Sequence, residues 1–213
     1  MVALTLWLSH WQTRRGDEKA ARQQLLESRA QAPVANITSA ALAADALLFR
    51  RARARGTFLA EGQLFIDNRM QGSRAGFHVI TPLLLQGGDV LLVNRGWVAR
   101  TAAYPAPPEV VVPPGEQEVQ GLAALPPQRF VELSPEVVAG RVWQNLSIER
   151  YAAQSSRPVV PVLLLAAYPG LAPVEERPDA GEAKHREYAL TWLSLAITTV
   201  ALWVGLNLRR VRR

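Results

Sequence analysis

Cysteine is absent from this chain of 213 residues, and histidine occurs only three times. Without a thiol the chain holds no disulfide, cysteine-bound zinc, iron–sulfur cluster or thiolate copper site. The sequence also lacks the G-x-S-x-G, G-x-G-x-x-G, P-loop and H-E-x-x-H patterns of common catalytic and cofactor sites. Because no pairing of a nucleophile with a base can be proposed, we expect a protein that is not an enzyme.

Positive charge is in excess, with 24 Lys+Arg against 18 Asp+Glu and a net charge of +6. Such a balance would permit nucleic acid as a partner. However, four arginines lie within the final five residues, Arg209–Arg213, directly after a long uncharged run, and the other basic residues are scattered without a nucleic-acid motif. Anionic lipid and the bias of positive charge toward the cytoplasm explain this placement. We therefore expect the lipid bilayer, and no nucleic acid, as a partner.

The uncharged run extends from Tyr188 to Leu208. As a helix it would be about 31 Å long at ~1.5 Å per residue, which matches the ~30 Å hydrocarbon core of a bilayer. We predict that residues 182–208 form a C-terminal transmembrane helix with its entry turn, and that residues 209–213 form a basic cytoplasmic tail. Arginines after the span place the preceding residues outside the cytoplasm.

The N-terminal stretch Met1–Trp11 is apolar but about half as long as a span requires. A signal peptide fits poorly, because no basic n-region or small-residue cleavage pattern is present. We interpret residues 1–13 as a partial transmembrane segment whose beginning lies upstream. Strong helix formers follow from Asp17 to Ala30, and Pro33 should end that helix.

Residues 14–181 are interpreted as one β-rich domain with few helices, which makes the chain α+β with a β-rich extracytoplasmic domain between two membrane helices. Alternating or apolar runs bounded by turn residues predict its strands. They are Arg51–Leu59, Gln63–Asp67, Phe77–Leu85, Val90–Val98, Glu116–Leu125 and Val159–Ala167. A glycine pair within residues 86–89 predicts a hairpin. The proline-rich stretch Tyr104–Gly115 is predicted to be a loop, and Leu146–Gln154 a short helix with Ser147 as its N-cap.

The three histidines differ in setting. His78 lies inside an apolar strand, where a structural histidine is expected, and His10 lies beside a tryptophan at the end of the first apolar segment. His185 precedes the span, and Tyr188 and Trp192 follow it at i+3 and i+7, so all three share a stripe if the helix begins one turn early. This stripe is either an interfacial anchor or a site in which the imidazole binds haem iron between aromatic rings.

The segment Asn94-Arg95-Gly96-Trp97 ends a buried-looking strand. One interpretation is a packed tryptophan beside a glycine-allowed turn. The other is that Arg95 contacts an anionic group, such as a propionate or a carboxylate of a partner.

Five ordered motifs together resemble the Surfeit locus protein 1 family, the membrane-bound assembly factors of cytochrome c oxidase. The motifs are Trp11-Gln12 with Arg14-Arg15 and Lys19; Asp67-Asn68-Arg69 with Gly76 and Thr81-Pro82-Leu83; Val93-Asn94-Arg95-Gly96-Trp97-Val98; Trp143-Gln144-Asn145-Leu146 with Arg150-Tyr151; and Lys184-His185 with Tyr188-Ala189 and Trp192. The resemblance covers nearly the whole chain. Arg186 and Glu187 depart from it, since the family tends to have apolar or glycine residues there.

The resemblance implies a protein of the bacterial inner membrane with two spans and its main domain on the periplasmic side. It implies a non-enzymatic role in inserting haem a into the large oxidase subunit or stabilising it there, with the haem a synthesis machinery as a further partner. The family's haem-ligand histidine falls on His185, which would bind the iron while Tyr188 and Trp192 line the ring and Arg95 contacts an anionic group. The alternative is a periplasmic scaffold, anchored in the membrane, that binds the oxidase subunit without binding haem.

Overall fold

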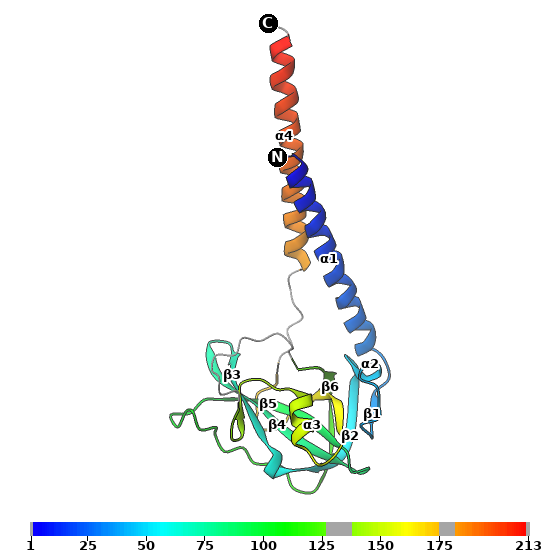
Figure 1. Ribbon diagram of the computed structural model, residues 1–213, viewed down its shortest axis with the longest axis vertical. Helices are drawn as coiled ribbons and strands as arrows, with labels where there is room; N and C mark the ends of the chain where they lie inside the picture. Colours follow the sequence, from blue (N-terminus) through cyan, green and yellow to red (C-terminus); the bar gives the residue numbers. More distant parts are fainter. Residues whose placement is uncertain (1, 127–137, 175–181, 212–213) are drawn as a thin grey trace. The chain divides into compact units, whose positions relative to one another are not determined.

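The computed structural model describes residues 2–126, 138–174 and 182–211. The chain divides into a helical unit, Met1–Ser28 with Glu176–Arg213, and a β-rich unit, Arg29–Glu175. Both units are shown in Figure 1.

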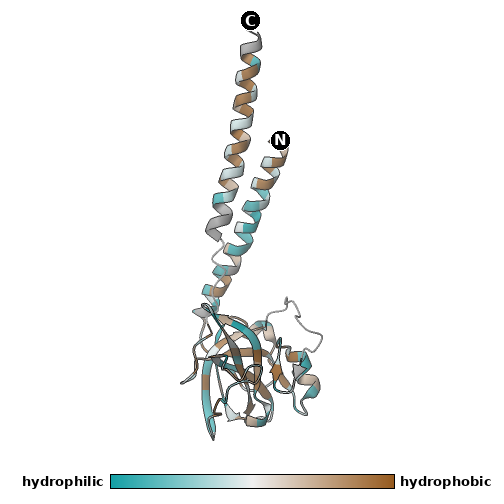
Figure 2. Ribbon diagram, turned by 90° about the vertical axis from the view of Figure 1, so that its left-hand side faces the viewer, coloured by the Kyte–Doolittle hydropathy of each residue, from teal (hydrophilic) through white to brown (hydrophobic). Residues whose placement is uncertain are grey.

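The helical unit contains two long helices, α1 (Val2–Ala30) and α4 (Glu182–Val211). In the described part of the chain, the segment Glu187–Leu208 of α4 is the single one long and apolar enough to cross a membrane, and Figure 2 shows apolar residues along most of that helix. The predicted C-terminal span is therefore matched by one helix. The helix predicted from Asp17 onward is confirmed as part of α1, whereas a membrane segment in residues 1–13 stays a prediction.

The β-rich unit contains nine strands and three short helices in its described residues. The strands are β1 (Ala35–Ile37), β2 (Arg51–Phe58), β3 (Leu64–Gln71), β4 (Arg74–Leu85), β5 (Val90–Ala99), β6 (Glu116–Ala124), β7 (Val138–Ala139), β8 (Val142–Trp143) and β9 (Val159–Leu165), and the helices are α2 (Ala44–Leu47), η1 (Ala60–Gly62) and α3 (Ile148–Gln154). A mixed sheet with separate helices confirms the α+β class. The extracytoplasmic location stays a prediction.

Five of the strands close into a ring. The sheet order is β1-β2-β6-β9-β5-β4-β3-β8-β7, and an additional pairing of β2 with β4 joins the ends of the segment β2-β6-β9-β5-β4. Closure is possible because β4 is long. Its first part, residues 74–80, pairs with β3, and its last part, residues 83–85, pairs with β2. Pro82 lies at the changeover, where its missing N–H costs no ladder bond to either strand.

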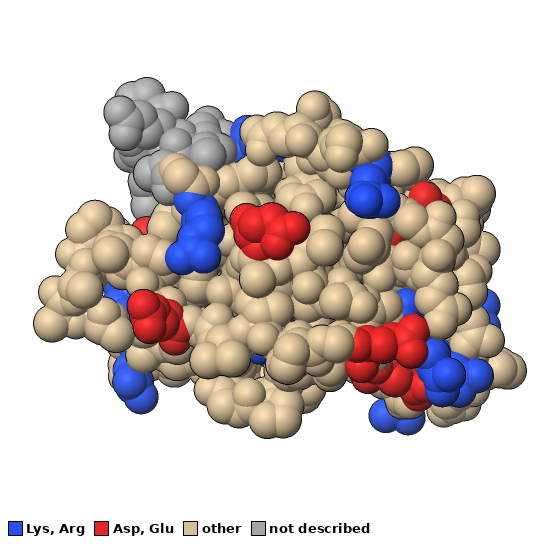
Figure 3. Space-filling view, turned by 90° about the horizontal axis from the view of Figure 1, so that it is seen from below, with Lys and Arg blue, Asp and Glu red and all other residues tan. Residues whose placement is uncertain are grey.

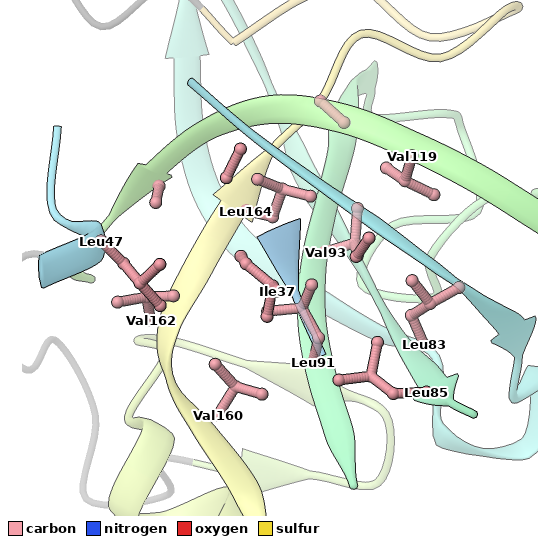
Figure 4. Close-up of a cluster of buried hydrophobic side chains, with 14 of the residues drawn as sticks. Ile37, Leu47, Leu83, Leu85, Leu91, Val93, Val119, Val160, Val162 and Leu164 are labelled. Atoms are coloured by element: carbon pink, nitrogen blue, oxygen red, sulfur yellow. The ribbon is translucent and has the colours of Figure 1, made fainter. Parts of the chain in front are cut away.

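The main core is built from the alternate, inward-facing residues of the ring. In β2 every second residue is buried, from Ala52 to Phe58, as the period of two in a strand requires. Figure 4 shows aliphatic side chains from β1, α2, β4, β5, β6 and β9 meeting in this cluster. Each fully buried Leu or Val contributes about 1.5–3 kcal/mol. A second cluster, around Trp143 and Ile148, packs α3 against the other side of β5 and β9.

Most predicted elements are confirmed with small shifts of their ends. Ser147 caps α3 as expected, because its Oγ accepts a hydrogen bond from the Arg150 N–H at 3.1 Å. The predicted hairpin turn joins β4 to β5, with Gly88 at a φ of 89°. No strand is described between Ala99 and Glu116, where the prolines gather. The strand β3 runs to Gln71, past the predicted end at Asp67.

Candidate functional site

Three of the five sequence motifs meet around an irregularity in β3. Asn68 has a φ of 56°, and the register of β3 against β4 shifts between Ile66 and Arg69. Asparagine tolerates this left-handed conformation better than most residues. The shift leaves Asp67 and Arg69 on either side of the irregular residue, where each contacts a different part of the domain.

Asp67 lies in a compact charged contact with the end of β5 and the loop after it. The Arg100 Nη2 atom lies 2.7 Å from Asp67 Oδ1, and the Tyr104 hydroxyl donates to Asp67 Oδ2 at 3.1 Å. The Arg100 guanidinium also lies over the Tyr104 ring, 4.0 Å from its centroid. This triad fixes the start of the proline-rich loop against β3.

Arg69 joins β3 to the motif that contains Trp143. Its Nη2 donates to the backbone oxygen of Gln144 and to Asn145 Oδ1, both at 3.2 Å. Burial lowers the pKa of Arg69, and the nearby charge of Asp67 opposes that change. The guanidinium therefore acts here as a rigid hydrogen-bond donor that ties two distant segments together.

Trp97 is the centre of the same cluster. Its Nε1 donates to the backbone oxygen of Arg69 at 2.7 Å. Gly76 lies directly beneath the ring: a Cβ atom there would come within 2.4 Å of the Trp97 side chain and 2.2 Å of the Val98 oxygen. Glycine is thus required at position 76 by close packing of the ring against β4.

His78 occupies the neighbouring position on β4, opposite Trp97 in the register with β5. Burial, and secondly the charge of Arg69, lowers the pKa of His78 from 6.5 to about 4. The imidazole is therefore neutral at physiological pH, as expected for the structural histidine inferred from sequence.

Arg95, the residue predicted to contact an anion, is only 3% exposed. Its Nη2 donates to the Val111 carbonyl at 2.8 Å, and its Nη1 to Gln63 Oε1 at 3.1 Å. The rings of Phe58 and Tyr168 lie 5.5 Å and 5.0 Å from the guanidinium carbon. In the described part of the chain no carboxylate pairs with Arg95. Neutral oxygens and aromatic faces stabilise its charge instead, so the anionic contact stays a prediction.

The other two motifs lie in the helical unit, where α1 and α4 run in opposite directions (Figure 1). The Ser9 Oγ donates to the Ala189 oxygen at 3.0 Å. Thr5 and Gly16 of α1 and Ala196 of α4 are also buried. Small residues with an interhelical hydrogen bond are typical of helices that pack closely within a membrane.

The contact of Ser9 with Ala189 sets the register of the two helices. Because both rise ~1.5 Å per residue, residues 12–13 of α1 are level with His185 of α4. The first and last sequence motifs therefore meet at one level of the helical unit, although they are separated by nearly the whole chain.

The predicted stripe lies on a single helix, as its spacing required. The helix α4 begins at Glu182, before His185, so His185, Tyr188 and Trp192 share one side of it. Tyr188 is 56% exposed and Trp192 is partly buried. The side chain of His185 lies outside the described part of the structure. Arg95 belongs to the β-rich unit, so the four predicted residues do not form one described cluster.

Arg100 and Tyr104 were missed as contributors to the motif cluster. Arg100 directly follows the Trp97 motif, but nothing in its spacing indicates that it pairs with Asp67, 33 residues earlier. In the described residues no group of three or more His, Cys, Asp or Glu side chains could hold a metal ion.

Comparison with known proteins agrees with this arrangement of motifs. A model of the SURF1 family matches residues 1–197. A SURF1-like protein of Caenorhabditis briggsae is 28% identical over 158 residues, which cover 71% of this chain and 48% of the relative. The Surfeit locus protein 1 of Mus musculus is 28% identical over 232 residues, covering 98% and 74%. A SURF1-like protein of Rickettsia conorii is 22% identical over 213 residues, covering 92% and 84%.

The match spans about half the length of the Caenorhabditis relatives but most of the Rickettsia protein. The family model extends from residue 1 into the membrane-length segment of α4, and it includes all five motifs. By that match over most of its length, the chain belongs to the SURF1 family.

Proposed function

We propose that this protein is a non-enzymatic membrane assembly factor for cytochrome c oxidase, which assists the insertion of haem a into the large oxidase subunit or its stabilisation there. Membership of the SURF1 family across residues 1–197 carries the proposal. The meeting of the first and last motifs at the level of His185 in the helical unit supports it. The haem a synthesis machinery is a further proposed partner.

The proposed topology has both helices of the helical unit in the bacterial inner membrane and the β-rich unit on the periplasmic side. The segment Glu187–Leu208 supplies one span. Arginines after this span mark its cytoplasmic end. The packing of Ser9 against Ala189 supports a membrane position for the first part of α1 beside it.

The residues of the α4 stripe fit a haem. When bound, haem a would supply an iron that can take an imidazole nitrogen as a ligand. His185 would provide that nitrogen. Tyr188 is more than half exposed, so its ring is available to a flat macrocycle, and Trp192 offers a second aromatic face one turn further along the helix. We infer that these residues hold the ring while transfer to the oxidase takes place.

The second candidate is a scaffold that recognises the oxidase subunit through the β-rich unit and binds no haem. The observation in its favour is the cluster around Trp97, where three motifs are joined by hydrogen bonds within the domain itself. A role confined to this cluster would make oxidase maturation depend on Trp97 and not on His185.

The experiment compares the full-length protein, purified in detergent from cells that make haem a, with its His185→Ala and His10→Ala variants. His10 is an exposed histidine of α1, so its replacement controls for the loss of a histidine as such. We expect His185→Ala to lower the haem content at least fivefold and His10→Ala to leave it unchanged. Equal haem content and spectra in all three proteins would refute the ligand assignment.

Oxidase maturation in the same cells separates the two candidates. If maturation fails with His185→Ala, the haem role is supported. If maturation survives His185→Ala but fails with Trp97→Ala in protein that still folds, the scaffold is favoured. If a deletion of the whole gene leaves oxidase maturation intact, both candidates are wrong.

A further inference from the structure

A hollow of about 530 Å³ opens on the surface of the β-rich unit, away from the cluster around Trp97. It lies along β2, between the end of β1 and the turn that follows β4. Its lining residues are Asn36, Ile37, Thr38, Arg53, Ala54, Arg55, Leu85, Gln86 and Gly87. Two of these residues are cationic, and none is acidic.

The two arginines come from the alternation that builds the core. In β2 the sequence Arg51-Ala-Arg53-Ala-Arg55 buries each alanine and exposes each arginine. The guanidinium groups therefore form a row on the outer face of the ring, one every second residue. Arg51 belongs to the row but does not line the hollow.

Arg55 is already paired. Its Nε lies 2.7 Å and its Nη2 2.6 Å from Glu118 Oε2 on the neighbouring strand β6. The hydrogen bond from Arg55 is the largest cause that lowers the pKa of Glu118, and Gln120 and the more distant charge of Arg53 add to it. Glu118 thus stays ionised and keeps Arg55 in place.

Arg53 is held but not neutralised. Its Nε donates to Asn36 Oδ1 on β1, which fixes the stem of the side chain at the hollow. Within the described chain no ion pair is formed by Arg53, and its two terminal amino groups have no partner there. A guanidinium with a fixed stem and free amino groups presents the fork geometry that binds a carboxylate.

The charge is local rather than spread over a broad basic face. Glu116 accepts a hydrogen bond from Gln86 at 2.9 Å, and Asp89 accepts one from the Ala40 N–H at 2.6 Å, and neither carboxylate lines the hollow. On the face of the domain seen in Figure 3, charged side chains are scattered, with acidic and basic groups side by side. The positive charge at the hollow is therefore that of two arginines, of which Arg55 is already paired with Glu118.

We propose that this hollow, with Arg53 as its anchor, receives an acidic side chain of a protein partner. The arginines of the row are exposed, so a lone small anion would bind in high dielectric and be weakened by salt. A side chain carried by a protein brings surrounding surface that covers the hollow and strengthens the charged contact. Arginine is also among the residues enriched in the binding hot spots of interfaces. The hollow is larger than one ion needs, and the side chains next to the acidic residue fill it.

The test uses the purified full-length protein and a fluorescein-labelled octaglutamate peptide, with octaglutamine as the uncharged probe. Wild type is compared with Arg53→Glu and Arg53→Gln, and with Arg51→Glu, which makes the same charge change on the same strand outside the hollow. We expect octaglutamate to bind wild type at least tenfold more tightly than octaglutamine does. Arg53→Glu should weaken octaglutamate binding at least tenfold, Arg53→Gln less, and Arg51→Glu less than threefold.

Two results would overturn the proposal. The first is equal loss of binding in Arg51→Glu and Arg53→Glu, or no preference for octaglutamate, which would mean that only general surface charge is sensed. The second is displacement of the peptide by inorganic phosphate at low millimolar concentration, which would indicate a site for a small anion. Circular dichroism of each variant verifies that these exposed substitutions leave the fold intact. Neither result depends on haem or on the oxidase, so the proposed function is judged separately.

Discussion

Acidification should destabilise the β-rich unit through His78, and replacing this residue by glutamine should remove the effect. The pKa of His78 is lowered from 6.5 to about 4 by burial and by Arg69. Folded protein therefore keeps the imidazole neutral down to about pH 4, whereas the unfolded chain takes up a proton below about pH 6.5. Between these values the unfolded state binds more protons, so stability falls as the pH falls.

The size of the effect follows from the difference between the two pKa values. At about 1.36 kcal/mol per pKa unit, complete protonation of the unfolded chain corresponds to roughly 3 kcal/mol. Between about pH 7.5 and pH 5 the expected loss is about 2 kcal/mol, because the native imidazole is still mostly neutral at the lower pH. That is a substantial share of the ~5–15 kcal/mol by which a domain of this kind is stable.

The assay is urea unfolding of the full-length protein in detergent, followed by tryptophan fluorescence at both pH values. Wild type should lose about 2 kcal/mol more than His78→Gln between pH 7.5 and pH 5, and the exposed His10→Gln should behave like wild type. An equal loss in wild type and His78→Gln would refute the reasoning, because it would show that His78 does not take up its proton on unfolding.

Two further predictions concern the cluster around Trp97, and both can be measured by the same urea unfolding. Gly76→Ala should lower the free energy of unfolding by about 3 kcal/mol, because the new Cβ would overlap the Trp97 ring. The control is Gly87→Ala, whose new Cβ would have its nearest neighbour at 3.5 Å and should change stability by less than about 0.5 kcal/mol. Similar losses in the two variants would contradict the packing argument. Asp67→Asn should cost about 1–2 kcal/mol, because it removes the charge that binds the partly buried Arg100, and an unchanged denaturation midpoint would mean that this pair contributes nothing to stability.

The strands of the ring could be predicted because their sequence pattern reports burial directly. The alternation of arginine and alanine in β2 indicates one solvent-exposed and one buried face, and the glycine pair before Val90 indicates the hairpin. By contrast, β1 and β8 are three and two residues long, which is too short for an alternation of buried and exposed residues to be recognised in the sequence. Closure of the ring depends on a pairing of β2 with the last residues of β4, and no local pattern reports such a long-range contact.

The motif cluster was recognisable as a set of motifs but not as a structure. Its contacts depend on the positive φ of Asn68 and the register shift beside it, which redirect Asp67 and Arg69. A sequence pattern with a period of two gives no sign of that shift. In the helical unit the phase of the α4 stripe could be predicted from spacing alone, whereas the packing of α1 against it depended on the small residues Thr5 and Ser9, whose spacing of four was a usable signal.

The position of β9 in the ring means that the ring can close only late in synthesis. This strand, Val159–Leu165, is the last of the ring to leave the ribosome, and it lies between β5 and β6, parallel to the first and antiparallel to the second. Until it arrives, the edges of β5 and β6 that it will cover lack their partner strand. The emerging chain therefore presents exposed strand edges from the synthesis of β5 and β6 until β9 arrives, the condition under which nascent β proteins aggregate.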